Sequence, residues 1–269
     1  MRSRWTSLVS DVRELLGEQV EYRELLYQMT KRDLLLRYKQ TAMGFGWAVL
    51  MPIINTIIFS VIFTRVARVE TGMPYPIFAY TGLVAWNFLA SSLRFSATSL
   101  SSNPSLVTKV YFPREIFPFS SVIVSLVDAA VAGVILLALM AWYGVPLTWA
   151  VLWVPVVVAA NIAFVTGLSL ILAMANLFYR DVKYIFEVVL AVWMFATSVV
   201  YPVDMVKGVA GRVLALNPMT PLIDAFRDVL LRGRAPSEAF WAASAVAVAV
   251  LAFAWVVFHR AEFTFAENV

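Results

Sequence analysis

Three of the charged side chains able to do chemistry in this sequence fall inside apolar runs. Arg94 and Glu187 each interrupt one run, and Asp128 lies near the middle of a third. A charge at the centre of a bilayer costs about 2.5–3.5 kcal/mol on insertion scales, so such a side chain normally faces protein or water. Arg94 could reach Asp128 or extend to the membrane surface. We interpret the two as a structural pair or as polar contacts along a substrate path, and we expect no special role for Glu187.

Four aromatic side chains lie where sugar rings could stack on them. Phe186, Trp193 and Tyr201 recur at spacings of seven and eight residues, which places them on one face of a helix. Trp86 lies near the middle of another apolar run, away from the membrane interfaces where most of the other aromatics fall. Such a stripe is explained either by core packing or by a surface on which the apolar faces of sugars stack. The sequence leaves both interpretations open.

Several kinds of chemistry lack the residues to perform them. The 269 residues include no cysteine, which excludes disulfides, thiol catalysis and iron–sulfur clusters. No GxxxxGK[ST] motif occurs, so the chain has no P-loop for ATP hydrolysis. His259 is the one histidine, and the acidic residues are scattered without metal-ligand spacing. We therefore expect no catalytic residue, no metal site and no cofactor in this chain.

The elements that must position these side chains are membrane helices. Hydrophobic residues make up 61% of the chain and charged residues 14%, against about half and about a quarter in soluble domains. A helix of about 20 apolar residues crosses the roughly 30 Å hydrocarbon core of a bilayer. The sequence predicts an all-α integral membrane protein with six such helices, at residues 44–64, 77–99, 116–143, 149–179, 184–203 and 239–258.

The first 42 residues are charged and amphipathic, which is typical of helices that lie along a membrane surface. They either dock a cytoplasmic partner or serve as an anchor. The TKRD stretch from Thr30 fits a capping box and predicts that a second short helix begins there. Eight basic residues precede the first span, so the positive-inside rule places both ends of a six-span chain in the cytoplasm. The outer loop 204–238, with five basic residues, disagrees with this orientation.

The segment between the fifth and sixth spans is more than a plain loop. In NPMTPLIDAFRDVLLRG, Thr220 suits an N-cap, Pro221 the first helical position and Gly233 a helix stop. A second short, mostly apolar segment precedes it at 205–216. Two short amphipathic helices in series predict a hairpin that re-enters the outer leaflet. Non-helical backbone at its tip, near Asn217, would have to be buried in protein or face water.

Four stretches carry a resemblance to a known family. They are RYKQTAMGFGWAVLMP (37–52), KVYFPREIFP (109–118), LNPMTPLIDAFRDVLLRG (216–233) and the tail FHRAEFTFAENV. Essentially the whole chain resembles the membrane subunit of ABC transporters that export polysaccharides, namely the O-antigen, teichoic acid and capsule permeases. The second stretch is closer to the O-antigen and teichoic acid branch than to the capsule branch.

The resemblance implies a homodimer of six-span subunits in the inner membrane, paired with two copies of a separate ATPase chain that binds ATP and Mg. It implies a membrane domain at 43–260 and a cytoplasmic tail at 261–269. Segment 101–115 would insert into the ATPase as a coupling helix, and helices within 204–233 would form an outer gate. A lipid-linked polymer would pass between the subunits, and nucleic acid has no part in this function.

The site residues divide into three groups. We assign ATPase coupling to Arg37, Tyr38, Asn103, Lys109, Phe112, Arg114 and Glu115. We assign the outer gate to Pro218, Pro221 and Phe226. The channel residues rest on spacing and burial cost instead of the resemblance, and they are Trp86, Arg94, Asp128, Phe186, Trp193 and Tyr201.

The leading hypothesis is ATP-driven export of a lipid-linked polysaccharide of the O-antigen type. Its alternatives within the family are teichoic acid or another wall glycan, then capsule, and then a drug or small lipid. A membrane glycosyltransferase on the same carrier is the alternative from another class, and it would need a catalytic cluster that the outer loop lacks. A structural scaffold is disfavoured because it would not need Asp128 at mid-membrane.

Overall fold

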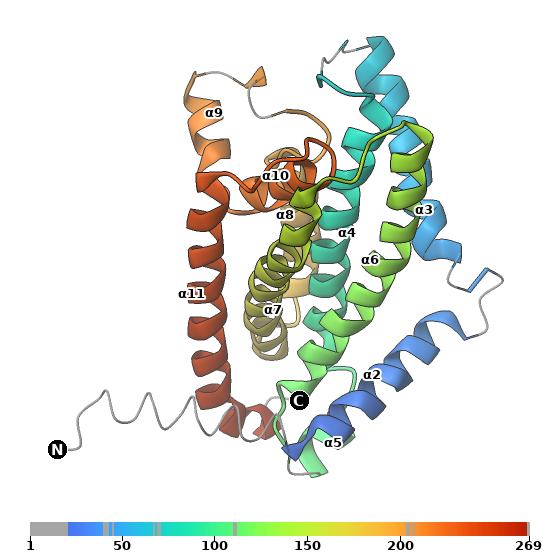
Figure 1. Cartoon of the computed structure of the whole chain (residues 1–269). Helices are drawn as coiled ribbons and strands as arrows, with labels where there is room; N and C mark the ends of the chain where they lie inside the picture. The colour runs from blue at the N-terminus through green and yellow to red at the C-terminus, as the bar shows by residue number, and fades with distance from the viewer. Residues whose placement is uncertain are drawn as a thin grey trace.

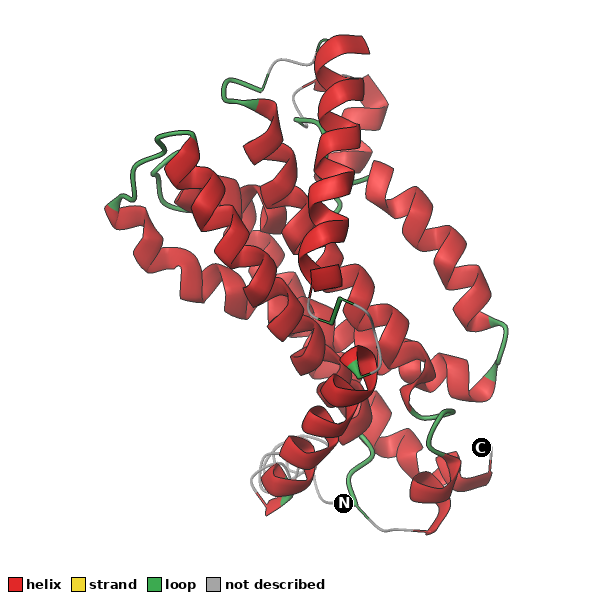
Figure 2. Cartoon of the chain, turned by 90° about the vertical axis from the view of Figure 1, so that its right-hand side faces the viewer, coloured by secondary structure: helices red, strands yellow, loops and turns green. Residues whose placement is uncertain are grey.

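The structure is a computed structural model that describes residues 21–39, 43, 44, 46–66, 68, 71–109, 112–202, 205, 206 and 208–267. Every regular element in these ranges is a helix, as predicted (Figure 2). The elements are α2 (Arg23–Tyr38), α3 (Gly46–Val61), η1 (Ile62–Val66), α4 (Tyr75–Ser99), α5 (Pro104–Lys109), α6 (Ile116–Trp142), η2 (Trp149–Trp153), α7 (Val154–Phe178), α8 (Val182–Phe195), α9 (Gly208–Ala215), α10 (Met219–Leu230), α11 (Glu238–Ala261) and η4 (Glu262–Glu267). The first half of the predicted amino-terminal segment lies outside the described residues.

Four helical segments are long and apolar enough to cross a membrane: Val49–Val66, Ile116–Trp142, Trp149–Phe178 and Glu238–Ala261. They correspond to the first, third, fourth and sixth predicted spans. The second predicted span is α4, with 25 residues. The fifth is α8, whose 14 residues rise only about 21 Å, less than the hydrocarbon core.

The core is built around α4. This helix packs against α6 and α7, and α11 packs along the other side of α7 (Figure 1). Ile77, Tyr80 and Leu89 of α4 have no exposed surface. Gly167 of α7 lies so close to α11 that a Cβ there would be 2.8 Å from the backbone nitrogen of Leu251. Four long helices, α4, α6, α7 and α11, therefore form the tightly packed core against which the shorter elements are placed.

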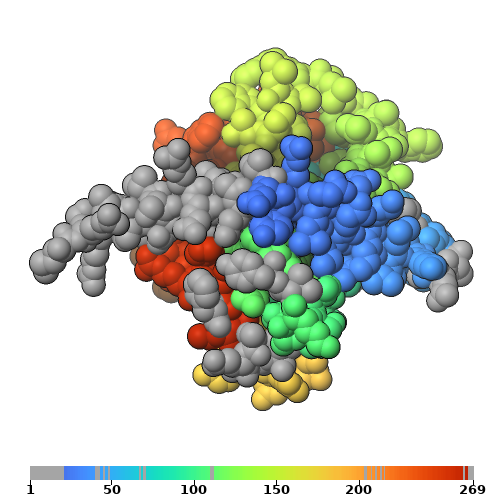
Figure 3. Space-filling model, turned by 90° about the horizontal axis from the view of Figure 1, so that it is seen from below, coloured from blue at the N-terminus to red at the C-terminus, as the bar shows by residue number. Residues whose placement is uncertain are grey.

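Helix α2 lies at the lower end of the bundle, on the same face as α5 and the end of α11 (Figure 3). It is one continuous helix, so the prediction of a new helix at Thr30 is wrong. The carboxylate of Asp33 does not cap a helix. Instead it accepts hydrogen bonds from the Ser120 hydroxyl at 2.6 Å and from the Arg32 guanidinium at 2.8 Å. Gly44, with φ of +51°, lies between α2 and α3, where only a glycine turns without strain.

Helix α10 crosses the upper half of the bundle and is centred on a buried arginine (Figure 1). Arg227 has no exposed surface. Its Nη1 donates to Ser198 O at 2.6 Å and to Asp224 Oδ1 at 2.8 Å, and its Nη2 donates to Val199 O at 2.6 Å. Its Nε reaches Phe78 O, and its guanidinium stacks 3.6 Å above the Phe78 ring. One side chain thus ties α10 to α4 and to the segment after α8.

The end of α8 follows from these bonds. The carbonyls of residues 196–199 would continue the helix if later N–H groups reached them. Instead Ser198 O and Val199 O accept from Arg227, and Ala196 O accepts from Asn217 Nδ2 at 2.8 Å. The helical prediction for 184–203 is therefore wrong beyond Phe195. Tyr201 lies past the end of the helix and cannot share a helical face with Phe186 and Trp193.

The start of α10 also differs from the sequence prediction. Asn217, not Thr220, supplies the cap, because its Oδ1 accepts from the Met219 N–H at 3.1 Å. The helix begins at Met219, and the Thr220 hydroxyl has no hydrogen-bond partner within the described part of the chain. Gly233, with φ of +66°, lies three residues past the last helical residue, Leu230.

Gly82 of α4 has no side chain, and this leaves the space that the Arg227 guanidinium occupies. A Cβ at position 82 would overlap the Val199 carbonyl and Arg227 Nη2. We expect Gly82→Ala to lower the free energy of unfolding by about 1–3 kcal/mol, as overpacking does in other cores. The measurement is unfolding of the purified protein in nanodiscs.

Gly133→Ala on α6 is the matched control, because no described atom lies within 4 Å of a Cβ at that position. We expect it to be neutral or to stabilise by up to about 1 kcal/mol through helix propensity. Equal effects of the two substitutions would contradict the close approach at Gly82.

Candidate functional site

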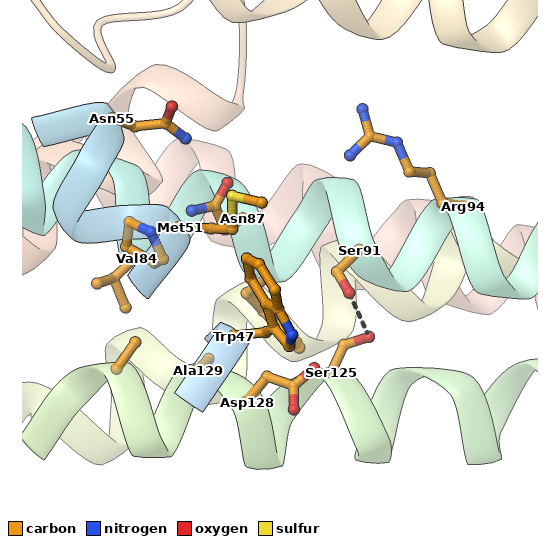
Figure 4. A pocket seen from close by; sticks show the side chains of 13 residues that line it. Trp47, Met51, Asn55, Val84, Asn87, Ser91, Arg94, Ser125, Asp128 and Ala129 are labelled. Carbon is orange, nitrogen blue, oxygen red and sulfur yellow. Dashed lines mark hydrogen bonds between the residues drawn. The ribbon is translucent and has the colours of Figure 1, made fainter. Parts of the chain in front are cut away.

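A polar cavity opens between α3, α4 and α6 (Figure 4). Its volume is about 320 Å³, within the range of ligand-binding pockets. Trp47 and Met51 of α3 form part of its wall, beside side chains able to form hydrogen bonds. These polar side chains are Asn55, Asn87, Ser91, Arg94, Ser125 and Asp128. In a chain this apolar, so many polar groups around one space make it suited to a hydroxyl-rich ligand.

A second cavity, of about 410 Å³, lies nearer the lower end, between α2, α4 and α6. Arg32 and Arg37 contribute positive charge to its wall. The hydroxyl and amide groups around it belong to Thr98, Ser99, Ser102, Asn103 and Ser121. Asp33 also lines this cavity and pairs with Arg32, and Arg37 pairs with Asp128, so an anionic group such as a phosphate would compete with these carboxylates for the two cations.

An ion pair forms the boundary between the two cavities. Asp128 lines the first and Arg37 the second, and their side chains are joined by a salt bridge. The Tyr38 hydroxyl donates to the other Asp128 oxygen, and the Arg37 guanidinium stacks 3.7 Å from the Phe95 ring centroid. Burial and the bond to Asp128 raise the pKa of Tyr38, so this residue stays a protonated donor. Asp128 thus joins α6 to the surface helix α2.

Arg94 does not pair with Asp128, although the sequence leaves that pairing open. Its side chain points away from Asp128 (Figure 4), and its Nε donates to both Glu187 oxygens, at 2.9 and 3.0 Å. Glu187, for which we expected no special role, is therefore the partner that joins α8 to α4. The two side chains are 51% and 50% exposed. They form a half-open ion pair within a predicted membrane-spanning region.

The predicted aromatic channel residues have different environments. Trp86 is buried and meets Trp193 edge to face, with ring centroids 5.8 Å apart. Trp193 is partly buried, and its Nε1–H donates to Asn217 Oδ1 at 3.2 Å. Phe186 packs against the same core, while Tyr201 donates its hydroxyl hydrogen to the Phe195 carbonyl. Trp86 and Trp193 are thus brought together, as part of the support of α10, and their stacking on sugars stays a prediction.

The residues assigned to coupling fall into two places. Arg37 and Tyr38 contact Asp128, as described above. Lys109 is exposed at the end of α5, and the Nδ2 of Asn103 donates to Ser99 O at 2.8 Å.

Phe112 and Glu115 are buried within this chain, and Arg114 is half-buried. Arg114 donates from Nη1 to Glu262 O at 2.7 Å and from Nη2 to Val107 O at 3.2 Å. These three residues hold α5 against the rest of the protein, whereas Lys109 faces outward.

The residues assigned to the outer gate lie at or within α10. Pro218 precedes the helix, Pro221 is in its first turn, and Phe226 packs on the main core beside Leu230. Their role as a gate stays a prediction.

The sequence interpretation missed Arg227 and Asn217 as structural centres. One signal for Arg227 was available: it lies four residues after Ile223 and three before Leu230, on the apolar face of the helix. An arginine on that stripe indicates burial with a partner. The meeting of Glu115, His259 and Glu262 near the lower end was also missed, because it joins segments far apart in the chain.

Comparison with known proteins identifies the family of the chain. Residues 24–231 match the family model described as ABC-2 type transporter. The chain is 34% identical over 258 residues to the O-antigen export system permease protein RfbA of Myxococcus xanthus, covering 95% of this chain and 99% of that protein. It is 26% identical over 245 residues to a protein of the same name from Klebsiella pneumoniae, covering 91% of this chain and 94% of that protein.

The Arg37–Asp128 pair can be tested by a double-mutant cycle. The two side chains are only 14% and 19% exposed. Arg37→Gln or Asp128→Asn alone should lower the free energy of unfolding by about 3–5 kcal/mol, because each leaves a largely buried charge without its partner. The double variant should lose less than the sum of the two.

The coupling energy of this cycle should be about 0.5–3 kcal/mol. Tyr38→Phe removes one donor to the same carboxylate and leaves the charges intact, so we expect a smaller loss than for either charge variant. Additive losses from the two charge variants would show that the pair contributes no net interaction.

Proposed function

Because the chain belongs to the ABC-2 type transporter family, we propose that it is the membrane subunit of an ATP-driven exporter of an O-antigen-type polysaccharide. Two relatives aligned over more than nine-tenths of this chain are O-antigen export permeases by name. The chain has no P-loop, so a separate ATPase chain with bound ATP and Mg must supply the energy.

In this proposal α4 and α8 complete a set of six membrane segments in the inner membrane, and the non-helical residues after Phe195 extend the reach of α8, which alone is too short to cross. Helices α9 and α10, at the end opposite α2 and α5 in Figure 1, are then on the outer side, and α2, α5 and the end of α11 are cytoplasmic. Both ends of the chain are then cytoplasmic. The five basic residues that oppose this orientation include Arg227, which is buried, and Arg232 and Arg234, which both pair with Asp228. Because the positive-inside rule counts Lys and Arg and not net charge, the orientation rests on the larger group of eight basic residues ahead of the first span.

The observation that carries the proposal is the half-open Arg94–Glu187 pair. Arg94 lies five residues before the end of α4 and Glu187 five residues after the start of α8, and half-exposed charges within such helices are not stable against lipid tails. They face either water or another protein surface. Helices α3 and α8 also expose large apolar residues such as Ile57, Ile58 and Val188. A second copy of this chain would cover these faces and leave the ion pair along a polar path between the subunits.

The two cavities suit the chemistry of a lipid-linked glycan. Amide and hydroxyl groups of the upper cavity match sugar hydroxyls, and Arg32 and Arg37 in the lower cavity match the phosphate that joins glycan to lipid. The Arg37–Asp128 pair closes the boundary between the cavities. Opening it would require α2 to move away from α6.

The coupling helix of this proposal is α5, whose exposed residues include Ser105, Thr108 and Lys109. Buried Phe112 and Glu115 serve as its support and do not contact the partner directly. We expect Lys109→Glu to weaken co-purification of the ATPase chain and to lower ATP hydrolysis in nanodiscs at least several-fold. Arg212→Glu is the control, since it reverses an exposed charge on α9 at the other end of the molecule.

Cells that lack the gene should accumulate the lipid-linked polymer on the cytoplasmic side, and the wild-type gene should restore export. A wild-type protein that neither binds the ATPase nor supports its activity would contradict the transporter assignment. Sugar transfer by the isolated chain would contradict it in favour of a glycosyltransferase.

A charge exchange tests the path itself. Arg94→Glu and Glu187→Arg alone each place two like charges together in the membrane and should reduce polymer export at least ten-fold. The exchanged double variant restores the pair and should regain part of the export. The measurement is surface polysaccharide in a strain without the native gene, with protein amount in the membrane as the control. Full export by both single variants would show that the Arg94–Glu187 pair does not line the transport path.

A further inference from the structure

A cluster of three side chains able to bind a metal ion lies near the lower end of the molecule, apart from both cavities. Glu115 precedes α6, His259 lies in the last turn of α11, and Glu262 follows that helix. One ligand atom from each lies within 4.8 Å of the others. The cluster joins two elements that are 144 residues apart in the sequence.

The separations allow a shared cation in place of the one long hydrogen bond between His259 and Glu115. His259 Nδ1 is 3.3 Å from Glu115 Oε1 and 3.7 Å from Glu262 Oε1. A nitrogen–oxygen hydrogen bond is usually 2.7–3.2 Å, and 3.7 Å is too long for one. Two ligands on a tetrahedral zinc ion, at bond lengths of about 2.0–2.2 Å, lie about 3.3–3.6 Å apart. The two histidine–carboxylate separations are therefore close to the ligand–ligand distances of such a site.

Glu115 supplies an independent indication of a missing positive partner. Its side chain has no exposed surface, and its Oε2 has no hydrogen-bond partner within the described residues. A divalent cation at this point would supply a partner for Oε2 and would offset the repulsion between the nearby Glu115 and Glu262 carboxylates.

Arg114 already holds Glu262 in a suitable position. Its guanidinium donates to the Glu262 carbonyl at 2.7 Å, and its backbone N–H lies 3.4 Å from Glu262 Oε2. The second contact leaves Glu262 Oε1 on the side of His259. Groups that orient a metal ligand in this way usually raise affinity 10–100-fold. The side chains of His259 and Glu262 keep 16% and 9% exposure, which gives an ion a route from solvent.

We propose that Glu115, His259 and Glu262 bind one divalent transition-metal ion of the zinc class. Imidazole nitrogen and carboxylate oxygen are both ligands that Zn²⁺ accepts, whereas Mg²⁺ and Ca²⁺ prefer oxygen ligands throughout. The bound ion connects the start of α6 with the end of α11, beside the segment that holds α5. The site is separate from the transport path, so this inference does not rest on the proposed function.

The first test titrates Zn²⁺ into the full chain in nanodiscs, purified with a tag that lacks histidine. Wild-type protein should bind one Zn²⁺ per chain, with millimolar Mg²⁺ present, and should unfold at a higher temperature once loaded. Glu115→Gln, His259→Gln and Glu262→Gln should each weaken Zn²⁺ binding at least ten-fold. Glu238→Gln is the matched control, because it changes an exposed acid at the opposite end of α11 and should leave binding unchanged.

A second test works even where a glutamine variant fails to fold. The chain has no cysteine, so His259→Cys introduces its one thiol. Zn²⁺ should slow alkylation of this thiol at least ten-fold, and Co²⁺ should give a thiolate charge-transfer band. Thr264→Cys, an exposed thiol outside the cluster, should react at the same rate with and without Zn²⁺. Absence of Zn²⁺ binding by the wild-type chain, or unchanged binding by all three glutamine variants, would overturn the proposal.

Discussion

The half of the protein drawn uppermost in Figure 1 depends on one buried guanidinium. A charge removed from water costs several kcal/mol even after relaxation, so Arg227 is stable only because its donors have carbonyl and carboxylate partners on every side. The Ser198 and Val199 carbonyls are stabilised by the same hydrogen bonds, because a buried backbone carbonyl without a donor is costly in an apolar environment. The same hydrogen bonds thus explain both the irregular segment after α8 and the packing of α10 across the bundle. The glycine at position 82 follows from the same contact.

Charges elsewhere in the apolar part of the chain also join separate elements. Arg37 and Asp128 connect a surface helix to α6, and Arg94 and Glu187 connect α4 to α8. The first pair is largely enclosed and stacked on an aromatic ring, as a structural contact should be. The second is half exposed and has no aromatic cover among the described residues, so it is the one suited to a changing environment. Similar ion pairs in one membrane protein can thus differ in role, and exposure is the property that separates them.

The sequence predicted well what depends on local composition and poorly what depends on distant contacts. Long apolar runs indicated the all-helical architecture, and four of the six predicted crossings meet the criterion of length and hydropathy. The amphipathic pattern located α10 because the buried residues on its packed face recur three and four positions apart in the sequence. The partner of Arg94 was not predictable, since Glu187 is 93 positions away and carries no signal of its own. The end of α8 was missed for a similar reason: an arginine 28 residues later takes the carbonyl of Val199. Asn217 was overlooked as a cap because Thr220 and Pro221 offered a more usual pattern.

The short length of α8 has a consequence for biosynthesis. The carbonyls of Ala196 and Val199, just past the end of α8, accept hydrogen bonds from Asn217 and Arg227. These two donors leave the ribosome later than the carbonyls do. At about 5–20 residues per second, the 28 residues from Val199 to Arg227 require on the order of a few seconds. During this interval the segment after α8 has exposed polar backbone, and bulk lipid is a poor environment for it. Insertion of this region is therefore best understood as one event, in which α8 and α10 leave the translocation machinery together. The folding unit in this part of the protein is then a helix with its later partner, and not a single membrane-crossing helix.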